Sequence, residues 1–75
     1  MKIKIIAILS EVRPEFDFSE IVNFVEQGML DSFDIVSLVT ALDENFDISI
    51  DGTDIVPENF SSIENIEKLL QKYIG

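Results

Sequence analysis

Hydrophobic residues recur at helical spacing in three stretches of the chain. In the first stretch they stand at positions i, i+3, i+4 and i+7, the spacing of one helix face. These residues are Ile5, Ile8, Leu9 and Val12. Residues 2–5 also alternate as a strand would, but the helical pattern is longer, so a helix of about three turns is predicted. Pro14 ends it, because the residue before a proline disfavours the helical conformation.

The second stretch predicts the clearest helix, which begins at Asp31 or Ser32, two residue types that favour a helix N-terminus. Its buried face follows the 3.6-residue period and comprises Ile35, Leu38, Val39, Leu42 and Phe46. Burial of each such side chain contributes roughly 1.5–3 kcal/mol, so this helix is expected to anchor the domain. The residues expected to face solvent are Asp34, Ser37, Asp43 and Glu44. Asp34 also suits the positive end of the helix dipole.

The third stretch predicts a C-terminal helix. Ser61 and Glu64 have the spacing of a capping box that opens it, and Gly75 ends it. Lys68 and Lys72 suit the negative end of its dipole. Its apolar face comprises Ile63, Ile66, Leu69, Leu70, Tyr73 and Ile74.

The segments between these helices carry no sustained period. Residues 15–30 are predicted to form a long loop, packed by its phenylalanines, with one or two helical turns near residues 19–26 that end at Gly28. Residues 53–56 form at most a short helix before Pro57. The predicted fold is therefore all-α: a small four-helix bundle of three main helices and one short helix, with a long loop between helices 1 and 2.

At 75 residues the chain accommodates one domain, residues 1–75, with a modest core. Hydrophobic residues make up 47% of it, which excludes a disordered acidic tail. Fifteen acidic and five basic residues give a net charge of -10, which repels nucleic acid and anionic membranes and attracts basic proteins. The apolar start is interrupted by charge well short of a membrane span. We expect a cytoplasmic monomer that neither binds nucleic acid nor inserts into a membrane.

Cysteine and histidine are absent from the sequence. Their absence removes disulfides, thiolate nucleophiles, the usual zinc ligands and the side chain best suited to proton transfer near neutral pH. We therefore expect no catalytic activity and no metal site. Ser32 is the remaining candidate, since a helix N-terminus offers N–H groups and partial positive charge to a phosphate ester. The alternative is that Ser32 simply caps the helix, as most serines in this position do.

Residues 28–33, Gly-Met-Leu-Asp-Ser-Phe, and the apolar helix that follows them resemble the attachment region of the acyl carrier protein family. The resemblance covers about residue 15 to the C-terminus. It implies that a phosphopantetheinyl transferase attaches 4'-phosphopantetheine from coenzyme A to Ser32. Acyl groups would then be held as thioesters on this arm and presented to enzymes of fatty acid, polyketide or secondary metabolite biosynthesis. The absence of cysteine fits this function, because the prosthetic group brings the sulfur.

By the same resemblance, Asp31 and Phe33 are the motif neighbours of the attachment serine. The family's second-helix acids that meet basic patches on partner enzymes correspond to Asp34, Asp43 and Glu44. Such contacts favour rapid exchange between partners over high affinity. Phe33 stands where leucine is common, and Ser37 where glutamate is frequent, and these departures imply a specialised set of partners.

Other interpretations of the sequence remain open. Residues 28–32 and the Pro-Glu-Asn-Phe stretch at 57–60 also resemble aminoacyl carriers of the D-alanyl or peptidyl type, although acyl carriage is favoured. Positions 1, 3, 5, 6 and 12 of an EF-hand calcium loop correspond to Asp47, Ser49, Asp51, Gly52 and Glu58. Bulky apolar Ile48 and Ile50 inside that loop, and Pro57 at its exit, argue against it. A plain interaction domain, with Ser32 as a cap, is the third alternative.

Overall fold

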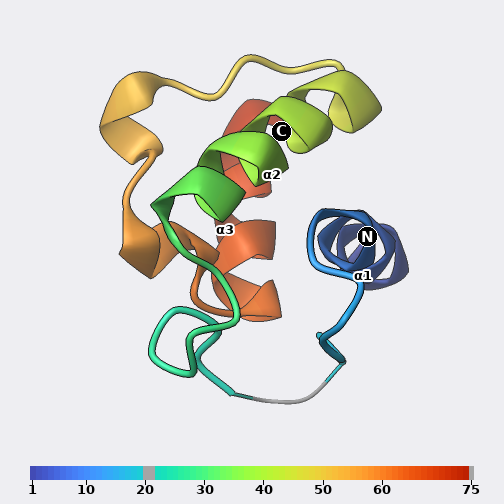
Figure 1. Cartoon of the computed structure of the whole chain (residues 1–75). Helices are drawn as coiled ribbons and strands as arrows, with labels where there is room; N and C mark the ends of the chain where they lie inside the picture. The colour runs from blue at the N-terminus through green and yellow to red at the C-terminus, as the bar shows by residue number, and fades with distance from the viewer. Residues whose placement is uncertain (20–21, 75) are drawn as a thin grey trace.

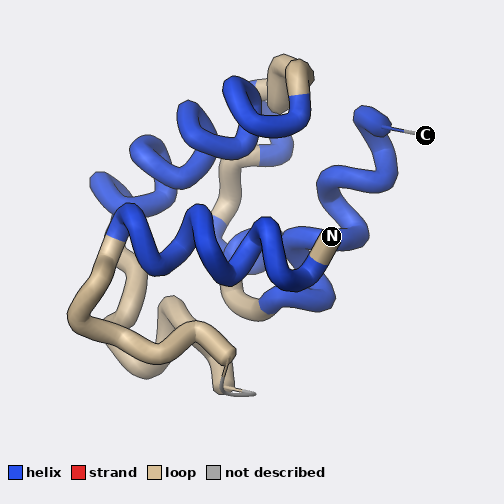
Figure 2. The backbone as a smooth tube through the Cα atoms, turned by 90° about the vertical axis from the view of Figure 1, so that its right-hand side faces the viewer, coloured by secondary structure: helices blue, strands red, loops and turns tan. Residues whose placement is uncertain are grey.

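The computed structural model describes residues 1–19 and 22–74, and every regular element within them is helical. The elements are α1 (Lys2–Val12), α2 (Ser32–Phe46), the 3-10 helices η1 (Gly52–Asp54) and η2 (Pro57–Phe60), and α3 (Ile63–Ile74). Figure 1 shows α2 crossing α3, with α1 to one side of both, and Figure 2 shows the long loop that joins α1 to α2. The predicted all-α bundle with its long first loop is confirmed. In place of the one short helix there are two 3-10 helices, of which only η1 overlaps the predicted residues.

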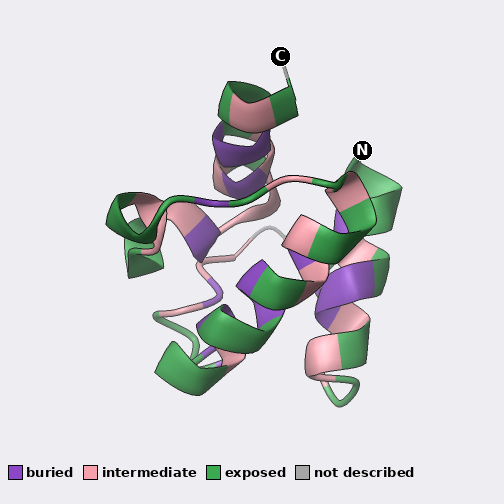
Figure 3. Cartoon of the chain, turned by 90° about the horizontal axis from the view of Figure 1, so that it is seen from above, coloured by how far each residue is buried: buried purple, intermediate pink, exposed green. Residues whose placement is uncertain are grey.

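The core lies where the apolar faces of the three α-helices meet. Helix α1 contacts both α2 and α3, and η2 packs against both α2 and α3. Figure 3 colours the buried positions purple. The buried residues of the α-helices are Ile5, Ile8, Leu9, Ile35, Leu38, Val39, Leu42, Ile66, Leu69 and Leu70. These positions confirm most of the predicted faces. Partly buried against the core are Val12, Phe46, Ile63 and Tyr73, and Ile74, at the end of α3, is 47% exposed.

The phenylalanines of the first loop pack into this core, as the sequence predicts. Phe18 and Phe24 are buried, and their rings meet edge to face with centroids 5.1 Å apart. The predicted helical turns near residues 19–26 fall partly on residues 20 and 21, which lie outside the described residues. Residues 24–28 form a hydrogen-bonded turn, and Gly28 ends it at a φ of 73°, a left-handed conformation that glycine adopts without strain.

The start of α3 differs from its prediction by one residue. The Ser62 hydroxyl accepts the backbone N–H of Asn65 at 3.1 Å and thereby caps the helix, so the predicted Ser61–Glu64 capping box is wrong. Ser61 is buried and is the C-cap residue of η2. Its hydroxyl donates to the Glu58 carbonyl at 2.9 Å. Two serines in succession left the sequence ambiguous at this point.

The C-terminal end of α3 is fastened to η1. The Tyr73 hydroxyl donates to one Asp54 carboxylate oxygen and accepts the backbone N–H of Asp51 at 2.9 Å. Lys72 Nζ donates to the other Asp54 oxygen at 3.0 Å. The short helix expected at residues 53–56 is η1, which starts one residue and ends two residues earlier, and η2 was not predicted.

The EF-hand interpretation does not fit this geometry. Helix η1 interrupts the supposed loop, and the Asp51 carboxylate caps it by accepting the backbone N–H and the hydroxyl of Thr53. Across residues 1–19 and 22–74, no three Asp, Glu, His or Cys side chains are grouped to hold a metal ion. Within the same ranges, no helix has the length and apolar character needed to cross a membrane.

Candidate functional site at the start of α2

The first turn of α2 is capped by Asp31 rather than by Ser32. The Asp31 carboxylate accepts the backbone N–H of Asp34 at 2.9 Å, and the Asp34 carboxylate accepts the backbone N–H of Asp31 at 3.1 Å. This reciprocal pair is a capping box in which both side chains are acids. The hydrogen bond from the Asp34 N–H lowers the pKa of Asp31, so the cap is ionised at neutral pH.

Ser32 is the first residue of α2, and its side chain is exposed. Among the described residues, its hydroxyl has no hydrogen-bond partner, because Asp31 already supplies the cap. Phe33 beside it is 83% exposed. The expectation that Ser32 caps the helix is therefore wrong, and its side chain is left exposed.

Arg13 connects this capping box to the end of α1. Its Nη1 donates to Asp34 at 2.7 Å and its Nε to Glu15 at 3.0 Å, while the guanidinium lies 5.1 Å from the centre of the Phe16 ring. The Asp34 side chain is consequently 14% exposed rather than open to solvent as predicted. No local pattern in the sequence predicts this ion pair, because its two partners are 21 residues apart.

The other predicted recognition acids lie at the far end of α2 and differ in exposure. Asp43 is half-buried and accepts the backbone N–H of Ile50 at 3.0 Å, which holds the chain as it leaves the helix. Glu44 is exposed and pairs with none of the described residues. The expectation of a solvent-facing side chain thus holds for Glu44 and Ser37 and is wrong for Asp34 and Asp43.

An uncharged strip runs along the outside of α2 from the attachment candidate. After Ser32 it comprises Phe33, Val36, Ser37 and Thr40, all exposed. Val36 is 61% exposed, and sequence reasoning did not single it out. Val36 follows Phe33 by three residues and lies off the predicted buried face. This spacing could have predicted that the two side chains are exposed side by side on α2.

The residues at the start of α2 fit a phosphate ester. The Ser32 hydroxyl is accessible, and the positive end of the helix dipole stabilises a negative group attached there. Arg13 offsets part of the charge of the two neighbouring acids. The sequence has no histidine, so no imidazole is available to accept the Ser32 proton.

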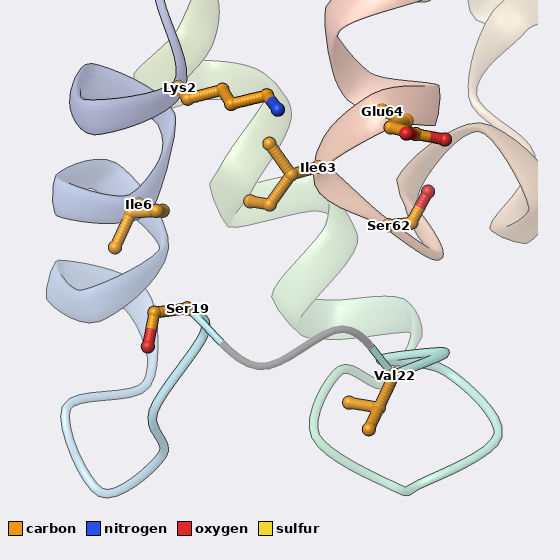
Figure 4. Close-up of a pocket in the computed structure, with 7 residues that line it drawn as sticks. All are labelled: Lys2, Ile6, Ser19, Val22, Ser62, Ile63 and Glu64. Carbon is orange, nitrogen blue, oxygen red and sulfur yellow. The ribbon is translucent and has the colours of Figure 1, made fainter.

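A cavity of about 310 Å³ lies between α1 and α3, away from this site (Figure 4). Its apolar lining comes from Ile6, Val22 and Ile63, and the Lys2 side chain extends from α1 toward α3 at its rim. No residue of α2 lines it. It is therefore separate from the attachment candidate.

Comparisons with known proteins agree with this site. A family model described as "Phosphopantetheine attachment site" matches residues 3–70. The chain is 33% identical to Aminoacyl carrier protein 1 of Bradyrhizobium diazoefficiens over 64 residues, 85% of this chain and 63% of that protein. It is 42% identical to the Acyl carrier protein of Buchnera aphidicola over 50 residues, 67% of this chain and 62% of that protein.

The chain spans a little under two thirds of the length of each of these relatives. No solved structure matches it significantly. The family model nevertheless covers most of the sequence, including the whole of α2. The chain therefore belongs to the acyl carrier protein family, whose prosthetic group is 4'-phosphopantetheine.

Proposed function

We propose that Ser32 carries the 4'-phosphopantetheine arm and that acyl groups are held as thioesters on its terminal thiol for delivery to partner enzymes. The observation that carries this proposal is the division of roles at the head of α2. Asp31 caps the helix, and Ser32 is left exposed at the first helical position. The chain has no cysteine, so the thiol comes from the arm.

Attachment needs an enzyme, and the chain itself is proposed to have no catalytic activity. Ser32 Oγ attacks the phosphorus next to the pantetheine of coenzyme A, a phosphodiester forms, and adenosine 3',5'-bisphosphate leaves. The hydroxyl proton passes to a base of the phosphopantetheinyl transferase. The residues around Ser32 present the hydroxyl and favour the negative product through the helix dipole.

Intact mass spectrometry tests the attachment site. After incubation with coenzyme A and a broad-specificity transferase, the wild-type chain should gain one phosphopantetheine, and Ser32→Ala should gain none. Ser37→Ala is the matched control, because it replaces another exposed serine of α2. It should be modified to the same extent as the wild type. No mass gain in the wild type, or a gain in Ser32→Ala, would contradict the proposal.

Partner enzymes are proposed to dock on the outer face of α2 while the protein works as a cytoplasmic monomer. Phe33 and Val36 offer apolar contact beside Ser32, and Glu44 offers an exposed charge to a basic patch. Asp34 and Asp43 are proposed to act less directly, since their carboxylates already hold Arg13 and Ile50. This arrangement gives apolar contacts near the arm and electrostatic contacts farther along the helix.

The cargo is proposed to be an acyl group, with an aminoacyl group as the second candidate. The second candidate is favoured by one observation: the similarity to an aminoacyl carrier protein extends over 85% of this chain. Offering the arm-bearing protein an acyl-adenylating and an aminoacyl-adenylating enzyme in parallel separates the two. Thioester formation with fatty acids supports acyl carriage, and exclusive loading with an amino acid would overturn it.

A further inference from the structure

Charge is nearly absent from the first three turns of α2. Fifteen of the 75 residues of the chain are acidic, yet residues 32–42 contain a single charged residue, Asp34. The exposed side chains of these turns are Ser32, Phe33, Val36, Ser37 and Thr40. Asp34 is therefore the one residue of this segment that could give the uncharged strip an acidic neighbour on α2.

Arg13 cancels the charge of Asp34. Its Nη1 donates to Asp34 Oδ2 at 2.7 Å, and the same oxygen accepts the backbone N–H of Asp31 at 3.1 Å. The exposed fraction is 28% for the Arg13 side chain and 14% for the Asp34 side chain. Arg13 Nε also binds Glu15, which belongs to the first loop. Because the two opposite charges are in contact, the first turn of α2 presents little net charge at Asp34.

Helix α1 contacts the other end of α2 through a second cation, Lys4. Its Nζ donates to the backbone carbonyl of Asn45 at 3.2 Å and lies 4.9 Å from the centre of the Phe46 ring. Glu44, beside these residues, is exposed and forms no ion pair within the part of the chain that the structure describes. Helix α1 thus cancels the acid that follows Ser32 and leaves the acid at the far end of α2 free.

A neutral surface of this kind fits a particular class of partner. The centres of protein interfaces are depleted in charged residues, because a carboxylate without a partner loses its hydration when an apolar surface covers it. Paired with Arg13, Asp34 can lie at the edge of an apolar contact without this penalty. Asp31 keeps its charge at the helix N-terminus, where the helix dipole offsets it. The matching partner surface has apolar and hydroxyl-bearing side chains opposite the uncharged strip and a basic side chain opposite Glu44.

We propose that Arg13 is a specificity-determining residue for docking on α2, an inference that rests on the proposed function. By pairing with Asp34, it matches the first three turns of α2 to partner enzymes whose contact surface is uncharged there. Partners that require a free acid beside the arm are disfavoured. Arg13 acts through Asp34 and is not a catalytic residue.

Steady-state kinetics of arm transfer by a broad-specificity phosphopantetheinyl transferase tests the inference. Arg13→Gln removes the cation and leaves Asp34 charged. We expect kcat/KM to fall about three- to five-fold, mainly through a higher KM, because docking is weakened and transfer is not. Arg13→Lys restores a cation and should stay within about two-fold of the wild type. The product is identified by intact mass, and all rates are measured well below the lowest Tm.

Removing both charges separates charge cancellation from a role in the fold alone. The double variant Arg13→Gln with Asp34→Asn has no charge to cancel, and an asparagine at position 34 can still accept the Asp31 N–H. Its kcat/KM should recover to within about two-fold of the wild type. An ion pair needed only to hold α1 against α2 would not be restored in this way. Lys68→Gln makes the same change in net charge at an exposed position of α3 and should match the wild type.

Ser37→Glu tests the same inference with the Arg13–Asp34 pair intact. It places an acid without a cation partner on the uncharged strip and should lower kcat/KM about three-fold. An unchanged or higher kcat/KM in this variant would overturn the inference, because the partner surface would then tolerate or prefer an acid.

Two further outcomes would overturn the inference and leave the carrier function standing. One is an unchanged kcat/KM in Arg13→Gln, and the other is a double variant as slow as Arg13→Gln, in each case with one arm found on Ser32. A wild-type chain that gains no arm at Ser32 would contradict the attachment proposal and this inference together.

Discussion

Helices α2 and α3 have similar buried faces and different outer faces. Both place leucines in the centre of the core. Helix α3 turns Glu64, Lys68, Gln71 and Lys72 to solvent, the usual pattern of a helix whose role is to fold the domain. Over its first three turns α2 instead exposes Phe33 and Val36 and no free charge, although the chain has a net charge of -10. This difference is the reason for proposing that partner enzymes dock on the outer face of α2.

The two helices also begin differently. Helix α3 is capped by Ser62, immediately before it. Helix α2 is capped by a pair of acids, and one of them, Asp34, is bound by Arg13 at the end of α1. The start of α2 is therefore fixed by tertiary structure, which gives the proposed attachment residue a defined position in the fold.

The largest expected effect concerns the buried faces, where the two helices should behave alike. Leu42→Ala in α2 and Leu70→Ala in α3 each remove a fully buried side chain and should lower the free energy of unfolding by about 2–5 kcal/mol. Urea denaturation measures this. Leu42→Met and Leu70→Met, which nearly conserve volume, should lose less than about 1.5 kcal/mol. A loss below about 1 kcal/mol in either alanine variant would show that its helix does not anchor the core.

Substitutions on the outer faces of α2 and α3 should differ in their effect on modification by a partner enzyme and not in their effect on stability. Val36→Asp should reduce kcat/KM of modification by a phosphopantetheinyl transferase about ten-fold, equivalent to about 1.4 kcal/mol, because it places a charge in the uncharged strip. Gln71→Asp puts the same charge on α3 and should leave the rate unchanged. Both exposed changes should alter the unfolding free energy by no more than about 0.5 kcal/mol. Equal rates for the two variants would remove the functional distinction between the faces.

The capping residues give a smaller effect on stability. Asp31→Ala and Ser62→Ala each remove a helix cap and should lower Tm by about 4–8 °C in a domain of this size. Arg13→Gln leaves the α2 cap in place but breaks its connection to α1, so its change in Tm should be smaller than that of Asp31→Ala. Differential scanning calorimetry gives the comparison. A larger loss for Arg13→Gln would show that the ion pair, not the cap, stabilises the start of α2.

Features that depend on residues close together in the sequence were predicted, and features that depend on residues far apart were not. The buried faces repeat every 3.6 residues, and the start of α2 depends on neighbours at Asp31 and Asp34, so both were readable locally. The Arg13 ion pair was not, since it exists only after α1 and α2 pack. Helix η2 was missed because Pro57 ends one segment and, at the first helical position, also begins another.

The smallest effect concerns pH and the fastening of α3 to η1, which has no counterpart in α2. The hydrogen bond from the Tyr73 hydroxyl, followed by the one from Lys72, lowers the pKa of Asp54 below its ordinary value of 3.8. The same bond to Asp54 raises the pKa of Tyr73 above its ordinary value of 10.0. A lowered carboxyl pKa gives stability that is lost as pH falls below 3.8, and a raised phenol pKa gives stability that is lost as pH rises above 10.

Tyr73→Phe should therefore lower Tm by a few degrees between about pH 4 and pH 10 and by less outside this window. A residual difference should persist at acid pH, because the variant also leaves the Asp51 N–H without its acceptor. Thermal melts from pH 2.5 to 11 measure the profile. Gln71→Glu, at an exposed position that makes no hydrogen bond to Asp54, controls for changes on α3 that do not remove the Tyr73–Asp54 bond. A constant Tm difference across the whole range would show that Tyr73 acts by packing its ring and not through Asp54.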